Sequence, residues 1–447
     1  MKSEFVNNTE KKCVSVVVLG DFGRSPRMQY HTLSLSKNNF RVDVVAYKGA
    51  EPHKRIINDQ NVSFHYMKNI PQWIEYSPGL FRYILKTVWQ SFFLFWTLIN
   101  ISKINHIFLQ NPPAVPTLPV ICFVCWLRNC CLVIDFHNYG YTILGLSAGK
   151  ESFLVKIAKW CERYFSLKAC RSICVTKAMK EDLMQNWNVR ASVFYDCAPD
   201  IFHPISEEEK HKFFMRLGED YGQFRAIPSN SNGEEATRFT KKEGDKYEVL
   251  NNRPALIVSS TSWTEDEDFS ILLSALEDYE EASKQMKDLP DLLVAITGKG
   301  PLKSYYERLI EDKGFSHVEV MTLWLQSEDY PTFLACADLG VSLHNSSSGF
   351  DLPMKVVDMF GCCLPVCAFE FQCLHELVKD GVFGKIFSNS RQLSLQFQNF
   401  LHDFPTKKTD LDKFRENLTK YGRLEWDENW NFVVYPLLTK KCSYHSN

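Results

Sequence analysis

The sequence of 447 residues lacks the marks of several common protein classes. Its formal net charge is only −2, whereas a nucleic-acid-binding protein normally carries an excess of basic residues, so no nucleic-acid partner is expected. No secretory signal peptide precedes the first apolar segment. Residues 20–25, which follow that segment, do not read GxGxxG, and this excludes the usual opening of a nucleotide-sugar epimerase or dehydrogenase.

Metal-binding patterns are also missing from the sequence. The 15 cysteines show no CxxC…CxxC or Cys/His spacing of a zinc site, and the adjacent pairs at 130–131 and 362–363 lie inside apolar runs. We therefore expect reduced, buried cysteines in a protein that faces the cytosol. Asp266 and Asp268 form a DxD-like sequence, but their place before Phe269 predicts the acidic first turn of a helix. No metal and no cofactor is expected.

The length suits two domains of roughly 200 residues each, and 45% hydrophobic residues are enough for two full cores. Apolar runs rich in β-branched residues alternate with helical stretches on both sides of a polar segment at 219–252. This alternation predicts an α/β fold with two Rossmann-like domains that face each other across a cleft. The predicted divisions are an N-terminal domain (1–205), a helix with a polar insertion or linker (206–252), a C-terminal domain (253–420) and a helix that packs back on the body (421–447).

The loop that follows the first predicted strand, Val14–Gly20, is a candidate anion site. Glycine lets backbone N–H groups approach a ligand closely, and the start of the next helix favours negative charge. Gly20 is therefore a candidate ligand contact, and Arg24 and Arg27 are candidate partners of a diphosphate. A purely structural turn is an equally good interpretation of this loop.

Polar side chains also gather at the end of the predicted strand Leu132–Asp135, in the sequence Asp-Phe-His-Asn-Tyr-Gly-Tyr at 135–141. In open α/β sheets ligands bind at this end of the strands. Histidine is the side chain whose ordinary pKa suits a general base at neutral pH. His137 is the candidate base, with Asp135 or Asn138 to orient it. The alternative is a histidine that only holds the loop through a hydrogen bond to a carbonyl.

The most specific segment is 344–366, in which a loop, a helix and a strand follow one another. The loop is rich in hydroxyl groups and glycine and opens a helix predicted at Leu352–Phe360, with a proline near its first position. The N–H groups of such a turn form an anion site for a diphosphate. Two aspartates, about two turns apart, would lie near one helix face, where a carboxylate accepts hydrogen bonds from a ribose diol. The candidate binding residues are Ser347, Ser348, Gly349, Asp351 and Asp358.

Residues 80–101 form a helical segment that is apolar on most sides. Its run Phe92–Ile99 is shorter than the ~20 residues that cross a bilayer. Aromatic-rich helices edged by cations, here Arg82 and Lys86, lie in the headgroup region of a membrane. This segment is the predicted membrane contact, with a buried core helix as the alternative. A second apolar stretch at 114–127 is expected to be core.

Segment 344–366 resembles the nucleotide-sugar signature of GT-B glycosyltransferases, and residues 298–302 and 337–341 resemble two further hallmarks of the same domain. More closely, nearly the whole chain is similar to the chitobiosyldiphosphodolichol β-mannosyltransferase family. The stretches that carry this likeness lie at 19–31, 108–113, 135–141, 259–269 and 346–366. The comparison adds to the candidate donor site Ser262, Trp263, Gly298, Lys299 and Lys355.

The resemblance implies transfer of the first mannose, β-linked, from GDP-mannose to dolichol-diphosphate-linked chitobiose on the cytosolic face of the endoplasmic reticulum membrane. It implies an inverting reaction, in which one base and a single displacement suffice. It also implies that the N-terminal domain faces the acceptor and the membrane surface and that the C-terminal domain holds GDP-mannose. Other enzymes of the same pathway on the cytosolic face are expected as further partners.

The sequence departs from the wider pattern in three ways. Ser348 and Phe350 stand where retaining GT-B enzymes carry the first of two paired glutamates, while Asp358 takes the second position. The Arg and Lys that often bind diphosphate after the first strand of the C-terminal domain are missing. The family usually has an N-terminal transmembrane anchor, yet only residues 1–13, mostly polar, precede the first predicted strand, so the anchor is either lost or missing from this sequence. An inactive GT-B scaffold of the oligosaccharide enzymes is the alternative function, although a scaffold would not need the intact loop at 346–358.

Overall fold

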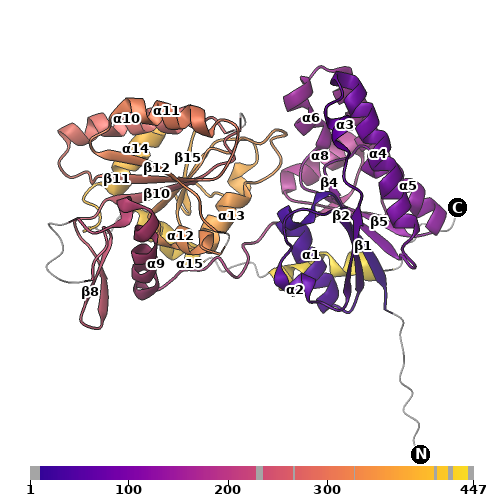
Figure 1. Cartoon of the computed structure of the whole chain (residues 1–447), viewed down its shortest axis with the longest axis horizontal. Coiled ribbons are helices and arrows are strands. Elements are labelled where there is room, and N and C mark those ends of the chain that lie inside the picture. Colours follow the sequence, from indigo (N-terminus) through magenta and orange to yellow (C-terminus); the bar gives the residue numbers. More distant parts are fainter. Residues whose placement is uncertain are drawn as a thin grey trace, which may run out of the picture. The chain divides into compact units, whose positions relative to one another are not determined.

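The chain divides into two compact units, and each is a parallel sheet covered by helices (Figure 1). The first unit runs to Asp196 and includes the C-terminal segment from residue 425, and the second is Cys197–Leu424. Both units have the predicted α/β architecture, which confirms that fold class. The computed structural model describes residues 11–227, 235–264, 267–326, 328–406, 410–420 and 426–440.

Among the described residues, the first unit has a seven-stranded parallel sheet in the order β3-β2-β1-β4-β5-β6-β7. β1 pairs with β2 on one side and with β4 on the other, so the strand order reverses beside β1. In open α/β sheets ligands bind at the carboxyl ends of the strands near such a reversal. The edge strand β3 was not predicted, although apolar Val62, Phe64 and Tyr66 alternate along it with polar Ser63 and His65. The strands are β1 Cys13–Asp21, β2 Arg41–Tyr47, β3 Val62–Met67, β4 His106–Asn111, β5 Cys131–Phe136, β6 Arg171–Cys174 and β7 Ala191–Val193.

Helices of two distant parts of the chain cover this sheet. The C-terminal helices α16 and α17 contribute Trp430, Val434 and Leu438 to a core that also contains β1 and β2 residues. The last described segment is therefore a structural part of the first unit. The helices are α1 Pro26–Lys37, α2 Lys54–Ile57, α3 Gln72–Glu75, α4 Gly79–Ile99, α5 Thr117–Arg128, α6 Gly140–Ala148, α7 Phe153–Ser166, α8 Lys177–Trp187, α16 Trp426–Val433 and α17 Tyr435–Thr439.

The second unit has, among its described residues, a six-stranded parallel sheet in the order β12-β11-β10-β13-β14-β15. Two separate apolar cores lie on its two faces, one formed with α10 and α14 and the other with α9, α12 and α13. The strands are β10 Ala255–Ser260, β11 Leu292–Thr297, β12 Val318–Leu323, β13 Leu339–Ser342, β14 Val366–Phe369 and β15 Gly384–Phe387. The helices are α9 Glu207–Asp220, α10 Phe269–Gln285, α11 Lys303–Lys313, α12 Tyr330–Cys336, α13 Met354–Gly361, α14 Ser390–Leu401 and α15 Asp410–Lys420.

The polar segment at 219–252 is more structured than its composition predicts. It contains a hairpin of β8 (Thr240–Glu243) and β9 (Lys246–Val249). Phe224 and Phe239 are buried in the core beside α9, so two aromatic side chains anchor a segment that otherwise consists mostly of polar residues. Its most polar stretch, 228–234, lies outside the described residues.

Candidate active site

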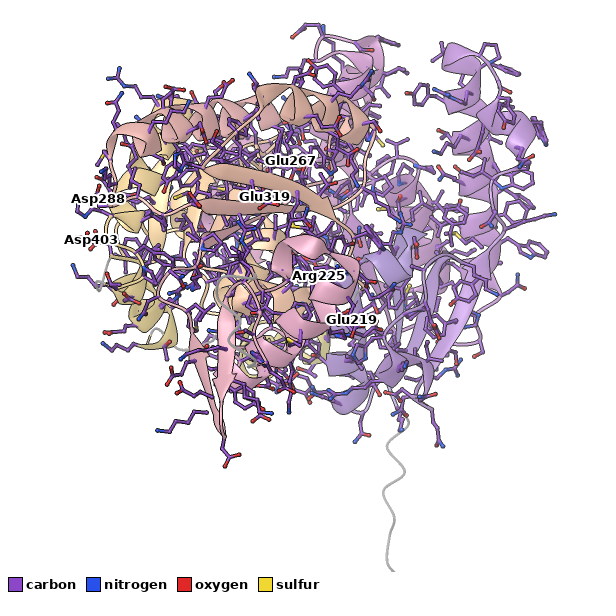
Figure 2. All side chains as sticks on the ribbon, turned by 60° about the vertical axis from the view of Figure 1, so that its left-hand side comes forward. Glu219, Arg225, Glu267, Asp288, Glu319 and Asp403 are labelled. Atoms are coloured by element: carbon purple, nitrogen blue, oxygen red, sulfur yellow. The ribbon has the colours of Figure 1, made fainter. Side chains whose placement is uncertain are left out.

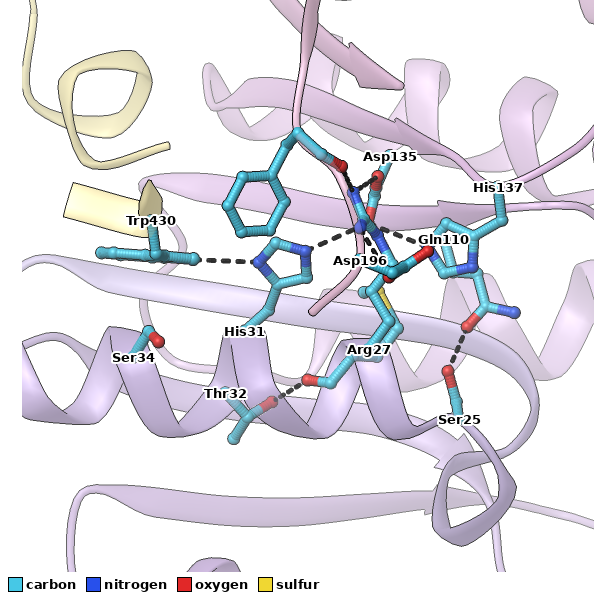
Figure 3. Close-up of polar contacts among 12 residues, drawn as sticks. Ser25, Arg27, His31, Thr32, Ser34, Gln110, Asp135, His137, Asp196 and Trp430 are labelled. Carbon is cyan, nitrogen blue, oxygen red and sulfur yellow. Dashed lines mark hydrogen bonds and ion pairs between the residues drawn. The ribbon is translucent and has the colours of Figure 1, made fainter. Parts of the chain in front are cut away.

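Asp135, near the end of β5, is the centre of a buried polar cluster in the first unit (Figure 3). Its Oδ2 accepts a hydrogen bond from Arg27 Nε at 2.8 Å and lies 3.1 Å from His31 Nε2 and 2.8 Å from His137 Nε2. Its Oδ1 accepts a second bond from Arg27 Nη2 at 3.0 Å. Burial alone would raise the pKa of Asp135, but the charge of Arg27 and the bonds from both histidines hold it well below its usual range. Asp135 is therefore a carboxylate at neutral pH.

Arg27 does not have the role that the sequence suggested. Its side chain is buried, and besides Asp135 it donates to Asp196 Oδ1 at 2.8 Å and to the carbonyl of Phe194 at 3.0 Å. The prediction that Arg27 meets a diphosphate is wrong for this structure, because protein acceptors already use the guanidinium. Arg27 instead neutralises two buried carboxylates.

His31 connects this cluster to the C-terminal segment. Trp430 Nε1 donates to His31 Nδ1 at 2.9 Å, so the proton of the neutral ring is on Nε2 and is donated to Asp135. Burial lowers the pKa of His31 to about 4, and the ring is therefore neutral at physiological pH. Sequence reasoning assigned no contact to either residue, because they lie 399 positions apart, although His31 ends the stretch 19–31 that carries the family resemblance.

His137 is the one member of the four-residue cluster around Asp135 with a partly exposed ring, 21% of its side chain being accessible. Because an ionised Asp135 can only accept, His137 Nε2 carries the proton of that bond, and Nδ1 remains as a lone-pair acceptor. The backbone N–H of His137 donates to the carbonyl of Asn111 at 2.8 Å and fixes the start of the loop. A carboxylate-oriented imidazole with an exposed edge can remove a proton from a hydroxyl group.

Glu162 of α7 fixes the loop after His137 through hydrogen bonds to its backbone. Glu162 Oε1 accepts from Asn111 Nδ2 at 2.7 Å and from the N–H of Gly140 at 2.9 Å, and Oε2 accepts from the N–H of Tyr141 at 3.1 Å. The carboxyl group thus caps the first turn of α6. Burial raises the pKa of Glu162 to about 7, although these three bonds oppose the shift. Nothing in the helical sequence around Glu162 pointed to this role.

The glycine loop after β1 is shaped by a neighbouring turn. A Cβ atom on Gly23 would lie 2.2 Å from the carbonyl oxygen of Ala50, so only glycine fits there. A Cβ on Gly20, the predicted ligand contact, would meet only Val18 Cγ1 at 3.9 Å, so packing does not require glycine there. Arg24 is highly exposed and lies 3.4 Å from Asp21, and its guanidinium remains accessible to a ligand.

Two loops meet at the carboxyl edge of the second sheet, after β10 and β11. Gly298 has a φ of 128°, and a Cβ on it would lie 1.8 Å from the carbonyl oxygen of Thr261. A Cβ on Gly300 would lie 1.8 Å from that of Ser262. The glycines therefore allow the two backbones to touch. Trp263 is 1% exposed and packs on Phe269, so its ring belongs to the core and the prediction of a donor-binding side chain is corrected here.

Lys355, in the first turn of α13, is tied to the loop after β10 by Glu267, which Figure 2 labels. Its Nζ lies 2.5 Å from Glu267 Oε1 and 3.4 Å from Ser262 Oγ. Glu267 Oε2 accepts from Thr261 Oγ1 and from the N–H of Ser262, both at 2.6 Å. Glu267, which the sequence did not single out, thereby places a half-buried cation beside the loop. The neighbouring Glu265 and Asp266 lie outside the described residues.

The serine-rich loop before α13 closes on itself. Gly349, with φ 81°, donates its N–H to Ser346 Oγ at 2.8 Å, and Ser346 Oγ donates to Asp351. Asp351 therefore braces the loop and does not lie on the helix as predicted. Leu352 precedes Pro353, and a residue before proline is disfavoured in helical conformation, so α13 begins only at Met354.

Asp358, half-buried on α13, lies close to two hydroxyl groups at the same edge. Burial and the charge of Asp358 raise the pKa of Tyr330, whose hydroxyl oxygen lies 2.9 Å from Ser260 Oγ. Ser347 and Ser348 also lie in this loop, and Ser348 Oγ accepts from the N–H of Phe350 at 3.1 Å. Lys299 is exposed, with its Nζ 3.7 Å from the centre of the Trp324 ring.

Within the described residues, one group could gather ligands for a metal ion, namely Asp288, His402 and Asp403. Figure 2 shows Asp288 and Asp403 together at the edge of the second unit, away from Glu267. His402 lies 2.5 Å from Asp288 and 3.1 Å from Asp403, so the three side chains already form ion pairs when the ring is protonated. The group takes no part in either candidate site. Asp268, from the DxD-like sequence, caps α10 by accepting from the N–H of Ser270, as predicted.

Two parallel-sheet units, each with polar side chains gathered at the carboxyl ends of its strands, are the architecture of a glycosyltransferase of the GT-B class. The solved structure of a sucrose-phosphate synthase from Thermosynechococcus elongatus matches this fold with a TM-score of 0.64 at 12% identity, over 96% of this chain and 99% of that one. Residues 239–425 match the glycosyl transferases group 1 family.

Curated relatives identify the particular family. The human chitobiosyldiphosphodolichol beta-mannosyltransferase is 47% identical over 95% of this chain and 92% of its own length. An Arabidopsis thaliana protein named UDP-glycosyltransferase TURAN is 43% identical over 96% of this chain and 97% of its own. The chain belongs to the chitobiosyldiphosphodolichol β-mannosyltransferase family, and it is a glycosyltransferase.

Proposed function

We propose that this enzyme takes mannose from GDP-mannose and joins it through a β-linkage to dolichol-diphosphate-linked chitobiose, on the cytosolic face of the endoplasmic reticulum membrane. Its reaction is the mannosyl-transfer step of dolichol-linked oligosaccharide synthesis. The observation that carries the proposed chemistry is the Asp135–His137 pair, in which Nδ1 of the partly exposed imidazole can accept a proton.

The proposed mechanism is a single displacement at the anomeric carbon. His137 Nδ1 takes the proton of the acceptor hydroxyl, the hydroxyl oxygen forms the new bond to the anomeric carbon, and the bond to the GDP oxygen breaks with inversion. Asp135, 2.8 Å from Nε2, stays ionised and stabilises the imidazolium that forms. The diphosphate leaves with its charge balanced by Lys355 and by the positive end of the α13 helix dipole, because the N–H groups of Gly349 and Phe350 in the preceding loop already bond to Ser346 and Ser348.

One transfer assay tests this function directly. Purified enzyme, labelled GDP-mannose and a phytanyl-diphosphate chitobiose acceptor in detergent should give a β-linked trisaccharide, and labelled UDP sugars should not replace the donor. Full activity is expected in excess chelator, because Lys355 supplies the cation for the diphosphate. Binding of GDP without any transfer would favour the inactive scaffold, and loss of activity in chelator would contradict the metal-free mechanism.

The donor nucleotide is proposed to rest on α13 of the second unit, with Asp358 accepting from the ribose diol. Asp358→Ala should weaken GDP binding by about 5–150-fold in titration calorimetry, which corresponds to about 1–3 kcal/mol for a lost acceptor of buried hydroxyls. Asp278→Ala, which removes an exposed carboxylate from α10 of the same unit, is the matched control. Equal GDP affinity in the Asp358 variant and the parent would exclude this ribose contact.

The proposed membrane contact of the first unit includes α4. Within the described part of the chain, no helix is both long enough and apolar enough to cross a bilayer. The apolar side chains of α4 nevertheless form an exposed stripe with a four-residue spacing, while Leu94 and Leu98 on the opposite side are buried. One side of α4 is therefore core, and the exposed apolar side supports the proposed membrane contact. The stripe contains Leu80, Ile84, Val88, Phe92 and Trp96.

Serine at Phe92 and Trp96, each 56% exposed, should lower vesicle binding and transfer to the lipid acceptor while leaving GDP affinity unchanged. Phe93 is left intact because its ring is partly buried against Trp89, 4.6 Å away, and its loss would test folding instead. Flotation with vesicles is the measurement. Unchanged flotation of the folded double variant would remove α4 from the membrane contact.

A further inference from the structure

A second exposed apolar face lies on α7 of the first unit. Phe153, Ile157, Trp160 and Tyr164 recur at intervals of four, three and four residues, which places them on one side of the helix. Phe153 is 75% exposed and Trp160 is 63% exposed. The opposite side of α7 is buried and carries Glu162, which holds the loop after His137. Packing within the unit therefore explains one side of α7 and leaves the other unexplained.

The exposed face continues onto α5. The expectation that residues 114–127 are core is confirmed for the side that carries Leu118, Ile121 and Val124, and is wrong for the other side. Phe123 and Trp126 are 51% and 76% exposed, with ring centres 5.8 Å apart. The ring of Phe123 lies 5.8 Å from that of Phe95 on α4, and Cys122 Sγ lies 3.7 Å from the carbonyl of Phe165 on α7. The helix α5 thus joins the α4 stripe to the α7 face within one compact unit.

The charges beside the α7 face have one predominant sign. Residues 150–168, all of which the structure describes, carry five basic side chains, and every one of them is exposed. The stretch has two acids: Glu162 is buried, and Glu151 is exposed and lies 3.3 Å from Lys156. Lys159 lies over the ring of Tyr141 and Lys168 over that of Tyr164, so cations and aromatic rings alternate on this surface. The five basic residues are Lys150, Lys156, Lys159, Arg163 and Lys168.

We propose that the face formed by α5 and α7 rests on a phospholipid bilayer and selects anionic headgroups. Aromatic side chains at the edge of the acyl region and lysines among the headgroups are the arrangement by which helices lie in a membrane interface. Negative lipids supply the complementary charge. A second copy of the chain is a poorer occupant, because a two-fold contact would place the same five cations against each other.

This membrane contact extends the proposed function. It rests on one part of that proposal, namely that the acceptor is a membrane lipid. The helix α6 starts at Gly140, directly after the loop of His137, and its Ile143 and Leu146 are also exposed. α6 is also packed against α7, through the bonds from Gly140 and Tyr141 to Glu162. The candidate base thus lies one loop away from the proposed membrane face, within reach of a sugar carried on a lipid diphosphate.

The test is vesicle flotation of the full chain, which needs no turnover. Neutral phosphatidylcholine vesicles are compared with vesicles that contain about one third phosphatidylserine. The parent is expected to bind the anionic vesicles at least ten-fold more tightly, with the difference removed by high salt. A Trp160→Ser/Tyr164→Ser variant should lose at least ten-fold on both compositions. Lys156→Gln/Lys159→Gln should lose only the preference for phosphatidylserine. Phe432→Ser, which removes an 84% exposed ring from α16, should bind as the parent does.

Three outcomes would overturn the inference. If both α7 variants float with vesicles as the parent does, the face formed by α5 and α7 is not a membrane contact. If only the α4 variant loses vesicle binding, the proposed function stands, with α4 alone as its membrane contact. Equal binding of the parent to the two vesicle compositions would exclude selection of anionic lipids. A parent that sediments as a dimer, and becomes a monomer on loss of Trp160 and Tyr164, would assign the face to a second copy. If the Trp160→Ser/Tyr164→Ser variant fails to fold, the Lys156→Gln/Lys159→Gln variant still tests the inference, because glutamine is compatible with a helix.

Discussion

Replacing His137 with alanine is expected to lower the rate of mannosyl transfer by about 10²–10⁴-fold, the range lost with a general base, while GDP binding stays unchanged. The expectation follows from the bond between His137 Nε2 and the ionised Asp135, which leaves Nδ1 to receive the acceptor proton. The proposed GDP site is in the second unit, so unchanged GDP affinity shows that donor binding is intact, and urea unfolding reports whether the first unit, which holds His137, is folded. Single-turnover transfer with labelled GDP-mannose is the measurement.

His203→Ala is the matched control, since this exposed histidine belongs to the second unit and its hydrogen bond among the described residues is to the carbonyl of Pro204. Turnover of the His137 variant near that of the parent would assign the base to another residue. Asp135 could not take that role, because it is fully buried and its oxygens are occupied by Arg27, His31 and His137. Glu265, in the stretch 259–269 that carries the family resemblance, would be the next candidate, and it lies outside the described residues.

The second large effect is expected on stability. Arg27→Met removes the cation between the buried carboxylates of Asp135 and Asp196 and should lower the free energy of unfolding by about 3–5 kcal/mol, the cost of an uncompensated buried charge. Urea unfolding measures the change. Arg24→Met is a close control, because Arg24 is 82% exposed on the preceding loop, and its loss should change stability by less than about 1 kcal/mol. A variant of Arg27 as stable as the parent would contradict the account of the cluster.

The pH dependence of stability gives a second test of the charge balance around Asp135 in the Arg27 variant. Without the cation, the pKa of Asp135 rises relative to the parent, because only the two histidines then oppose the effect of burial. The folded variant therefore keeps a proton that the folded parent has lost, and its stability deficit should grow as the pH rises through the pKa of Asp135. The parent behaves differently: the pKa of His31 is lowered to about 4, so the unfolded chain takes up a proton first as the pH falls below about 6.5. Its stability should decrease from pH 6.5 to 4.

Local patterns in the sequence predicted the parts of the fold and site that depend on neighbouring residues. The run Val14–Gly20 is rich in β-branched residues and lies within β1, and Asp135 and His137 stand together because they follow one strand. The loop before α13 was recognisable because its hydroxyl and glycine residues are contiguous. The start of that helix was predicted two residues early, since the effect of Pro353 on Leu352 was not taken into account.

The residues that sequence reasoning missed make their contacts across long separations. His31 reaches Asp135 over 104 positions and Trp430 over 399, and Lys355 reaches Glu267 over 88. A single histidine in a helix or an acid after a strand has no spacing that distinguishes it from a solvated side chain. The exposed ring of Trp126 was assigned to the core for the same reason, because apolarity alone does not say which side of a helix meets the protein.

Because the C-terminal helices pack on the first unit, they determine when that unit can finish folding during synthesis of the chain. Ribosomes release the chain from the N-terminus, so β1 emerges first, yet the core that covers it is complete only when Trp430, Val434 and Leu438 have followed. The second unit, encoded in between, has all of its residues available earlier. The unit that begins folding first thus finishes last, with apolar surface uncovered in the interval and open to chaperones. A premature stop near residue 425 would then damage the site of Arg27, Asp135 and His137 at the other end of the gene, by removing the indole that fixes the proton on His31.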